Sequence, residues 1–312
     1  MHSYYGRQDL EGCIALKKAE LHLHLEGSID AETLLEIEPG LDRAEIEANL
    51  SGKTFAEFLQ GYIWITKRLQ TPEHYALATR HLLERLASQD VTYAEITLSA
   101  GVVLWKGQDL AAVYDAIWEV SQKSRVKTYW ILDAVRHFGA EAAVKVVEFA
   151  VAQRDKGTIA FGIGGDEQRG PAEWFRDIFK YARDGGLRLT CHAGETVGPE
   201  SIWAALDIGS ERIGHGVSAV QDETLLARLR ESDIPIEVCI SSNVRTGVVG
   251  SVEQHPVRRL YEAGVPIVLN TDDPSFFQTS LTREYEIAER VFGLPIEELA
   301  ANSFKYAFGS VG

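Results

Sequence analysis

Two histidines near the start of the chain have the residue type and spacing of a metal site. His22 and His24 lie in the run Glu-Leu-His-Leu-His-Leu-Glu-Gly at residues 20–27. Side chains two residues apart on a strand point to the same face, so both imidazoles could bind one metal ion while the leucines pack on the other face. The alternative is a pair of hydrogen-bonded core histidines, because imidazole is often partly buried and usually finds a partner.

Three further polar clusters follow short apolar runs in the second half of the chain. They are Leu-Thr-Cys-His-Ala-Gly-Glu at 189–195, Arg-Ile-Gly-His-Gly at 212–216 and Ile-Val-Leu-Asn-Thr-Asp-Asp-Pro at 267–274. In a barrel of parallel strands the carboxyl ends of the strands meet at one mouth, so these clusters could become neighbours. Histidine nitrogen and carboxylate oxygen together suit Zn²⁺, and a catalytic zinc site keeps one coordination position for water.

The elements that would position these clusters alternate between strands and helices. Segments with helical periodicity, such as 109–123 and 222–230, separate eight apolar runs. This alternation predicts one (β/α)8 TIM barrel domain over residues 1–312, and the continuous apolar runs fit parallel strands covered on both faces. The predicted strands are 19–25, 92–98, 127–134, 159–163, 187–192, 212–215, 235–240 and 266–271.

A helical insertion and crossover of about residues 28–91 follows the first predicted strand, and it is longer than a simple crossover needs. It contains predicted helices at 55–68 and 73–87, of which the first is rich in aromatic and aliphatic side chains. One interpretation is ordinary amphipathic packing on the core. The other is a lid that covers the barrel mouth and lines an apolar pocket for a planar ligand.

Composition and charge narrow the class of protein. The chain has 312 residues, 45% hydrophobic and 25% charged, which suits one globular barrel. A net charge of −15 disfavours nucleic acid and anionic membranes as partners, and no apolar stretch is long enough to span a bilayer. We see no basic leader followed by an apolar segment, and Cys13, Cys191 and Cys239 are a poor disulfide framework. These features predict a cytoplasmic protein.

The motifs HLHLEG, GGDE, HAGE, GHG, SSN and NTDDP occur in this order, close to the ends of predicted strands. In this order they resemble the adenosine deaminase family of metal-dependent amidohydrolases, and the resemblance covers about residues 17–302. It implies a Zn²⁺-dependent enzyme that hydrolytically deaminates a small-molecule 6-aminopurine. Members of the family often run longer, so a further helix after residue 312 would be compatible with the resemblance. The oligomeric state is left open.

The resemblance also implies roles for individual residues. Glu195 would carry a proton to purine N1, and His215 would orient or deprotonate the attacking water. Asp273 would hydrogen-bond N7, and the backbone N–H of Gly165 would contact N3. The implied zinc ligands are the residues that match the family's metal-binding motifs, namely His22, His24, His192 and Asp272.

Independently of the family resemblance, the chemistry of deamination requires these residue types. A 6-aminopurine is a poor electrophile at C6, and zinc lowers the pKa of bound water to about 7. A neutral carboxylic acid could protonate the ring, which requires an enclosed site that raises the pKa of Glu195. The plainer alternatives are that Glu195 caps the following helix, that backbone groups satisfy His215, and that Asp272 and Asp273 form a turn or N-cap before Pro274.

Two residues in segments that depart from the family pattern, Glu26 and Arg245, bear on which substrate is expected. Adenosine-specific members carry aspartate where this chain has Glu26, at a position associated with the 5′-hydroxyl. Arg245 could meet a carboxylate near the mouth, or it is a solvated surface residue. Both features favour 6-aminodeoxyfutalosine, an intermediate of menaquinone biosynthesis with a carboxyphenyl ketone arm on its 5′ side, over adenosine and then adenine. The same residues would also suit an amidohydrolase of another heterocycle or ester, or a non-catalytic metal- and nucleoside-binding barrel.

Overall fold

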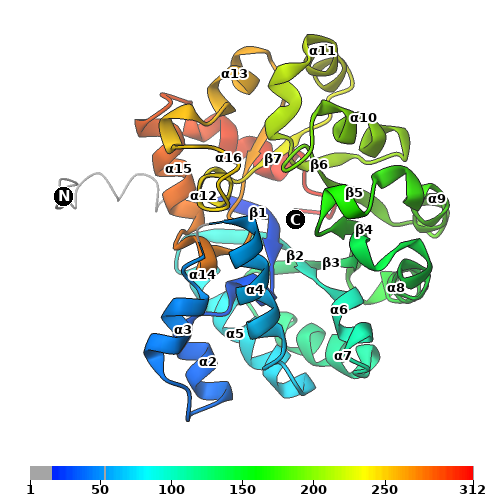
Figure 1. The fold of residues 1–312 in the computed structure, drawn as a ribbon, viewed down its shortest axis with the longest axis vertical. Helices are drawn as coiled ribbons and strands as arrows, with labels where there is room; N and C mark the ends of the chain where they lie inside the picture. Colours follow the sequence, from blue (N-terminus) through cyan, green and yellow to red (C-terminus); the bar gives the residue numbers. More distant parts are fainter. Residues whose placement is uncertain (1–15, 53, 312) are drawn as a thin grey trace.

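Eight parallel strands form a barrel in which the order in space follows the order in the chain. The computed structural model describes residues 16–52 and 54–311, and Figure 1 shows the strands at the centre with helices around them. The predicted (β/α)8 barrel is confirmed. The strands are β1 (Lys18–His24), β2 (Val91–Leu98), β3 (Lys127–Val135), β4 (Thr158–Gly164), β5 (Arg188–Ala193), β6 (Arg212–His215), β7 (Ile236–Val238) and β8 (Ile267–Leu269).

The last two strands are shorter than the sequence predicts, because the chain leaves the sheet to build the mouth of the barrel. The predicted strands continued to 240 and 271, whereas β7 ends at Val238 and β8 at Leu269. Cys239 directly precedes a short helix, α12 (Ile240–Arg245). Residues beyond β8 instead bond to β1.

Hydrogen bonds between β1 and the residues after β8 close the barrel. Oδ1 of Asn270 accepts from the backbone N–H groups of Leu21 and His22, at 2.9 and 3.1 Å. The backbone N–H of Asp272 donates to the carbonyl of His22 at 3.0 Å, and that of His24 donates to the carbonyl of Asp272 at 2.9 Å. This closure holds Asp272 beside the two histidines of β1.

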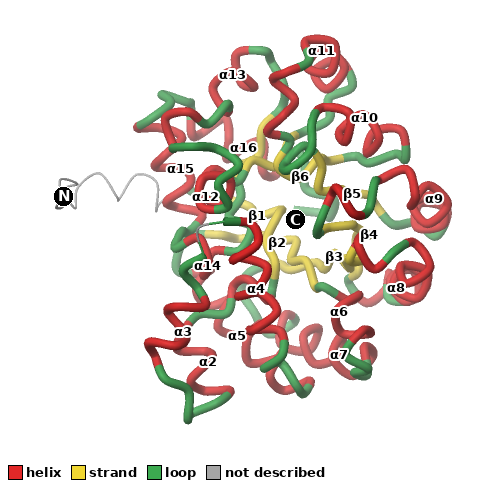
Figure 2. Tube along the Cα trace, viewed as in Figure 1, coloured by secondary structure: helices red, strands yellow, loops and turns green. Residues whose placement is uncertain are grey.

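Helices (red) surround the strands of the barrel (yellow), as Figure 2 shows. In α7, Asp109 caps the N-terminus by accepting from the N–H groups of Ala111 and Ala112, and Val113 and Ile117 are buried one turn apart. The predicted helices at 109–123 and 222–230 are confirmed as α7 and α11. The surrounding helices are α7 (Leu110–Ser121), α8 (Ala140–Ala152), α9 (Arg176–Asp184), α10 (Pro199–Asp207), α11 (Glu223–Glu231), α13 (Val257–Glu262), α15 (Leu281–Arg290) and α16 (Ile296–Lys305).

The insertion between β1 and β2 contains one helix of the outer ring and one helix at the mouth. Its elements are η2 (Glu26–Ser28), α2 (Ala31–Ile37), α3 (Arg43–Asn49), α4 (Phe55–Thr66) and α5 (Pro72–Ala87), which confirm the two predicted helices. The outer helix, α5, packs against α7 and β2. The mouth helix, α4, places the ring of Phe58 5.2 Å from that of Phe276 and 5.3 Å from that of Phe277, both in α14 (Pro274–Phe277).

Two further sequence expectations concern the cysteines and a membrane-spanning segment. Cys191 and Cys239 are buried free thiols, while Cys13 lies outside the described residues. No helix in the described part combines the length and the apolar character that crossing a bilayer requires.

Candidate active site

The carboxyl ends of β1, β5, β6 and the segment after β8 bring histidines and an aspartate together. His22 and His24 lie on β1, His192 on β5, and His215 is the last residue of β6. Candidate ligand atoms of His22, His192, His215 and Asp272 all lie within 4.8 Å of one another. Residues more than two hundred positions apart in the sequence thus share one point, as a barrel mouth allows.

The spacing within this cluster fits a metal ion. Nε2 of His24 lies 3.1 Å from Nε2 of His192 and 3.4 Å from Oδ1 of Asp272, and Nε2 of His22 is also 3.4 Å from that oxygen. Ligand atoms about 2.0–2.2 Å from a zinc ion lie about 3.0–3.5 Å from each other. Nε2 of His22 is buried and has no hydrogen-bond partner within the described residues. A bound cation would satisfy that nitrogen.

Backbone geometry at two of these residues is strained. His215 and Asp272 have φ values of 65° and 63°, in the left-handed region. Such conformations cost on the order of 1–3 kcal/mol in non-glycine residues and cluster at functional sites. A Cβ atom on the preceding Gly214 would lie only 2.7 Å from Cε1 of His22, so glycine is needed for β6 to approach that ring. The first glycine of the GHG motif therefore has a steric cause.

Three side chains of the cluster, those of His22, Asp272 and His215, are held by partners outside the cluster. Nδ1 of His22 lies 2.7 Å from Oε2 of Glu237 on β7. Oγ of Ser242 donates to Oδ2 of Asp272 at 2.7 Å, and Nδ2 of Asn243 lies 3.1 Å from Nδ1 of His215. Such partners fix ring orientation and ligand basicity. Ser242 and Asn243 belong to the SSN motif, whereas Glu237 was not predicted, although its signal is a carboxylate inside an apolar strand.

Glu195 lies beside this cluster, after the end of β5. Its Oε2 is 3.7 Å from Nε2 of His215. The carboxylate of Glu167 accepts from the backbone N–H groups of Gly194, Glu195 and Thr196 at 2.8–2.9 Å and so fixes the loop. Burial, followed by the negative charges of Asp272 and Glu167, raises the pKa of Glu195 well above its ordinary value. The environment therefore favours the protonated form of this side chain.

Side-chain capping, the plainer role considered for Glu195 and Asp273, does not match the structure. The helix after Glu195, α10, begins at Pro199 with Gly198 as its N-cap and has no side-chain cap. Asp273 precedes α14 without a side-chain capping bond, and its Oδ1 is buried with no hydrogen-bond partner in the described chain. Burial and the charge of Asp272 raise the pKa of Asp273 well above its ordinary value. The Nδ1 atom of His215 pairs with a side chain, that of Asn243, and not with the backbone.

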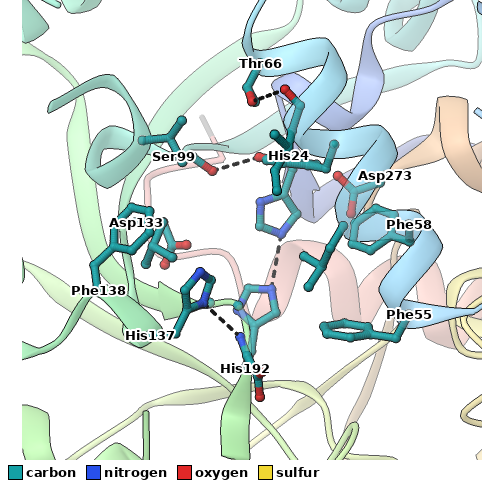
Figure 3. A pocket seen from close by; sticks show the side chains of 18 of the residues that line it. His24, Phe55, Phe58, Thr66, Ser99, Asp133, His137, Phe138, His192 and Asp273 are labelled. Carbon is teal, nitrogen blue, oxygen red and sulfur yellow. Dashed lines mark hydrogen bonds between the residues drawn. The ribbon is translucent and has the colours of Figure 1, made fainter. Parts of the chain in front are cut away.

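A cavity of about 320 Å³ opens above the cluster. Figure 3 shows His24, His192 and Asp273 around it together with the aromatic rings of Phe55 and Phe58. The predicted apolar lining by the insertion is present, because five residues of α4 besides Thr66 line the cavity. They are Phe55, Phe58, Leu59, Tyr62 and Ile63.

Only two of the four predicted substrate contacts line this cavity, namely Gly165 and Asp273. Glu26 is buried behind the wall, where its two oxygens accept from the backbone N–H of Ser99 at 3.1 Å and from the hydroxyl of Tyr62 at 3.2 Å. Burial raises the pKa of Glu26 to about 7. Arg245 is the half-buried last residue of α12, and its neighbour Thr246 faces the cavity in its place. The expected contacts of Glu26 and Arg245 with the substrate are therefore not supported.

Two kinds of lining residue were not predicted from the sequence. Asp133 on β3 brings a further carboxyl group to the cavity, and its signal is an acidic residue inside the apolar run Trp-Ile-Leu-Asp-Ala-Val. Lys67 and Arg169 are exposed cations that line the outer part. No local pattern marks these two residues, because their position depends on how α4 and the loop after β4 pack.

A (β/α)8 barrel with a His/Asp cluster at the carboxyl ends of its strands has the architecture of a metal-dependent barrel enzyme. The family model described as adenosine deaminase matches residues 17–311. The chain therefore belongs to the adenosine deaminase family, which supports its being an enzyme.

Curated relatives carry two different substrate names. An aminodeoxyfutalosine deaminase from Streptomyces avermitilis is 38% identical over 320 residues, which cover 96% of this chain and 89% of the relative. An adenine deaminase from Rhizobium leguminosarum bv. trifolii is 38% identical over 296 residues, 92% of each chain. The crystal structure of adenine deaminase from Arthrobacter aurescens matches with a TM-score of 0.88 and 28% identity, over 95% of each chain.

Proposed function

We propose that this chain is a Zn²⁺-dependent hydrolytic deaminase of a 6-aminopurine nucleoside, 6-aminodeoxyfutalosine or adenosine, with the 6-oxo purine and ammonia as products. One observation carries the proposal. The cluster around Nε2 of His22, which has no hydrogen-bond partner in the described residues, lies at the base of a cavity and next to the protonatable carboxyl of Glu195. The names of the curated relatives support deamination of a 6-aminopurine.

The metal would be held by His22, His24, His192 and Asp272. When bound there, Zn²⁺ would supply a nucleophile at neutral pH, because it lowers the pKa of bound water to about 7. The protein's contribution is to hold the ligands in place. Glu237 orients the ring of His22 through Nδ1, and Oγ of Ser242 fixes Oδ2 of Asp272.

Two side chains would take part in proton transfer during the reaction. Glu195 would hold a proton and deliver it to N1 of the purine, since its raised pKa favours the neutral acid. Burial lowers the pKa of His215 to about 4, so its Nε2 is available to accept a hydrogen bond or proton from the attacking water. Asn243 fixes the ring of His215 for this task.

The purine would be oriented by Asp273 and Gly165. N7 and N3 are both hydrogen-bond acceptors, so each needs a donor. Asp273 is suited to donate to N7, because burial and the charge of Asp272 raise the pKa of its carboxyl group and so favour the protonated form. Gly165 has a φ of 92°, which only glycine adopts easily, and its backbone N–H would meet N3.

The cavity supports a substrate larger than a free base. Its volume of about 320 Å³ is in the range of pockets for drug-sized ligands, and a bare purine would leave its outer part empty. That outer part is lined by aromatic side chains and by the cations Lys67 and Arg169. An arm with an aromatic ring and a carboxylate, as in 6-aminodeoxyfutalosine, would complement both. In this proposal Lys67 and Arg169 take the place that was expected for Arg245.

Two different functions compete with this proposal. Free adenine as the substrate is favoured by the name of the Rhizobium leguminosarum relative, which is as similar as the aminodeoxyfutalosine deaminase. A non-catalytic nucleoside-binding barrel would not need the adjacent acid and base groups of Glu195 and His215.

A cytoplasmic location stays a prediction from the cysteine pattern.

The test is ammonia release by the purified zinc-loaded protein on 6-aminodeoxyfutalosine, adenosine and adenine, each measured as kcat/KM. We expect the order of preference to follow that list. A clear preference for adenine would replace the nucleoside assignment with free adenine. No ammonia from any of the three would contradict the deaminase itself.

A further inference from the structure

Asp133 places a buried carboxyl group in the wall of the cavity. This group has no hydrogen-bond or ion-pair partner among the described residues. Asp133 lies near the end of β3, is 4% exposed and lines the cavity. Figure 3 shows its carboxyl oxygens directed toward the space around His24 and His192. A buried carboxyl group that faces a cavity in this way is expected to meet a polar group of the ligand.

The surroundings of Asp133 leave its oxygens open toward the cavity. Asp133 pairs with Gly162 on β4, and Cβ atoms added at Gly162 and Gly164 would lie 3.2 and 2.9 Å from its two oxygens. The nearby cation is Arg136, whose guanidinium donates to the carbonyls of Gly170 at 2.6 Å and of His192 at 2.7 Å. Arg136 therefore balances charge without occupying the hydrogen-bonding positions of Asp133.

Either protonation state of Asp133 could pair with a hydroxyl group. Burial raises the pKa of Asp133 to about 8, against the opposing charge of Arg136. A carboxylate accepts from a hydroxyl, and a neutral carboxylic acid can both donate to it and accept from it. An aromatic C–H, by contrast, would leave the carboxyl group unsatisfied. The chemistry of the group thus matches an alcohol of the ligand.

The order of strands around the barrel indicates which alcohol that would be. Gly165, proposed to meet N3, follows β4, and Ser99 follows β2, so Asp133 on β3 lies between them. In a purine nucleoside the sugar is attached at N9, beside the N3 edge of the base. In the anti conformer of the nucleoside, the hydroxyl on the second sugar carbon is the one nearest to N3.

We propose that Asp133 binds the 2′-hydroxyl of the substrate's ribose and makes the enzyme selective for ribonucleosides over 2′-deoxyribonucleosides. This inference rests on the proposed function, deamination of a 6-aminopurine nucleoside. It extends that function, because neither the deamination chemistry nor the purine contacts require a group at this position. It also gives the cavity a sugar contact in place of Glu26, which is turned away toward Ser99 and Tyr62.

The test compares kcat and KM for adenosine, 2′-deoxyadenosine and adenine in the wild type, Asp133→Ala and Asp133→Asn. We expect the wild type to prefer adenosine over 2′-deoxyadenosine about ten- to hundredfold in kcat/KM. Asp133→Ala should bring that ratio to about one by lowering only the value for adenosine. Asp133→Asn keeps a hydrogen-bonding group of the same shape and should retain part of the preference.

The control is Asp155→Asn, which changes a side chain that is 92% exposed and should keep the wild-type ratio. Equal wild-type activity on adenosine and 2′-deoxyadenosine would overturn the inference, and so would an equal loss on all three substrates in the folded Asp133 variants. The wild-type ratio remains decisive even if Asp133→Ala does not fold. Failure of the wild type to deaminate any 6-aminopurine would instead contradict the proposed function.

Discussion

Nδ1 of His22 lies 2.7 Å from Oε2 of Glu237, so the opposite ring nitrogen, Nε2, faces Asp272. The second oxygen of Glu237 lies 2.6 Å from Nε of the buried Arg212, which also pairs with Glu95 at 2.6 Å. The charge of Arg212 lowers the pKa of Glu237, which keeps it ionised despite burial. A charged network below the mouth thus sets the orientation of a candidate metal ligand.

Glu237→Gln should weaken metal binding although it substitutes none of the candidate ligand residues. The amide keeps the shape of the side chain but removes the negative charge next to His22, and such changes cost about ten- to a hundredfold in metal affinity. The measurement is competition for Zn²⁺ against a chelating dye. Glu211→Gln, which alters a partly exposed pair with Arg188, should leave the affinity unchanged. Wild-type affinity in Glu237→Gln would show that the contact is dispensable.

Glu195→Gln should lower kcat at least about a hundredfold, because the amide cannot deliver a proton to N1. Zinc content and the affinity for a ground-state ligand should stay near wild type, since the group acts in the transition state. Burial raises the pKa of Glu195 well above its ordinary value, and the acid acts in its protonated form, so wild-type kcat/KM should fall as the pH rises through that raised pKa. Glu200→Gln, on the exposed face of α10, serves as the control. Undiminished turnover in Glu195→Gln would remove it from the mechanism.

If α4 acts as a lid, a ligand should protect it from proteolysis. Phe58 and Tyr62 line the cavity, and Phe58 packs against α14 across the mouth, so an occupied cavity would stabilise this helix. Limited proteolysis with and without a purine nucleoside analogue should show slower cleavage within 50–68. Cleavage near 154–156, on an exposed turn, should be unaffected. Unchanged cleavage of 50–68 would count against a lid.

Arg169→Ala should lower kcat/KM for 6-aminodeoxyfutalosine about tenfold, since a charge-assisted hydrogen bond to the carboxylate is lost. Adenosine has no such anion and should react as before. Arg245→Ala should change neither value, because Arg245 does not line the cavity. A selective effect of Arg245→Ala with none from Arg169→Ala would reverse this assignment.

The fold could be predicted from the sequence because each strand and helix has a local pattern. Apolar runs placed all eight strands, and helical periodicity placed α4, α5, α7 and α11. The predicted strands run two residues beyond the observed ends of β7 and β8. After β7 the chain turns into α12, and after β8 the side chain of Asn270 bonds to β1, which no local pattern shows.

The candidate site was predictable only where residues lie at strand ends. His22, His192 and Asp272 follow that rule, and the structure brings them together. Glu26 and Arg245 do not line the cavity, and the sequence could not show this because the direction of each side chain depends on distant partners. Glu26, for example, turns to Ser99, which lies 73 positions later in the chain.

The most direct test of the account is a metal titration followed by ammonia release. Protein stripped with a chelator should be inactive on a 6-aminopurine nucleoside and should regain full activity at about one equivalent of Zn²⁺. Folded His192→Ala, which removes one nitrogen from the cluster, should neither retain zinc nor recover activity. Full deamination by the stripped protein, or normal zinc content in His192→Ala, would contradict a metal-dependent deaminase centred on these residues.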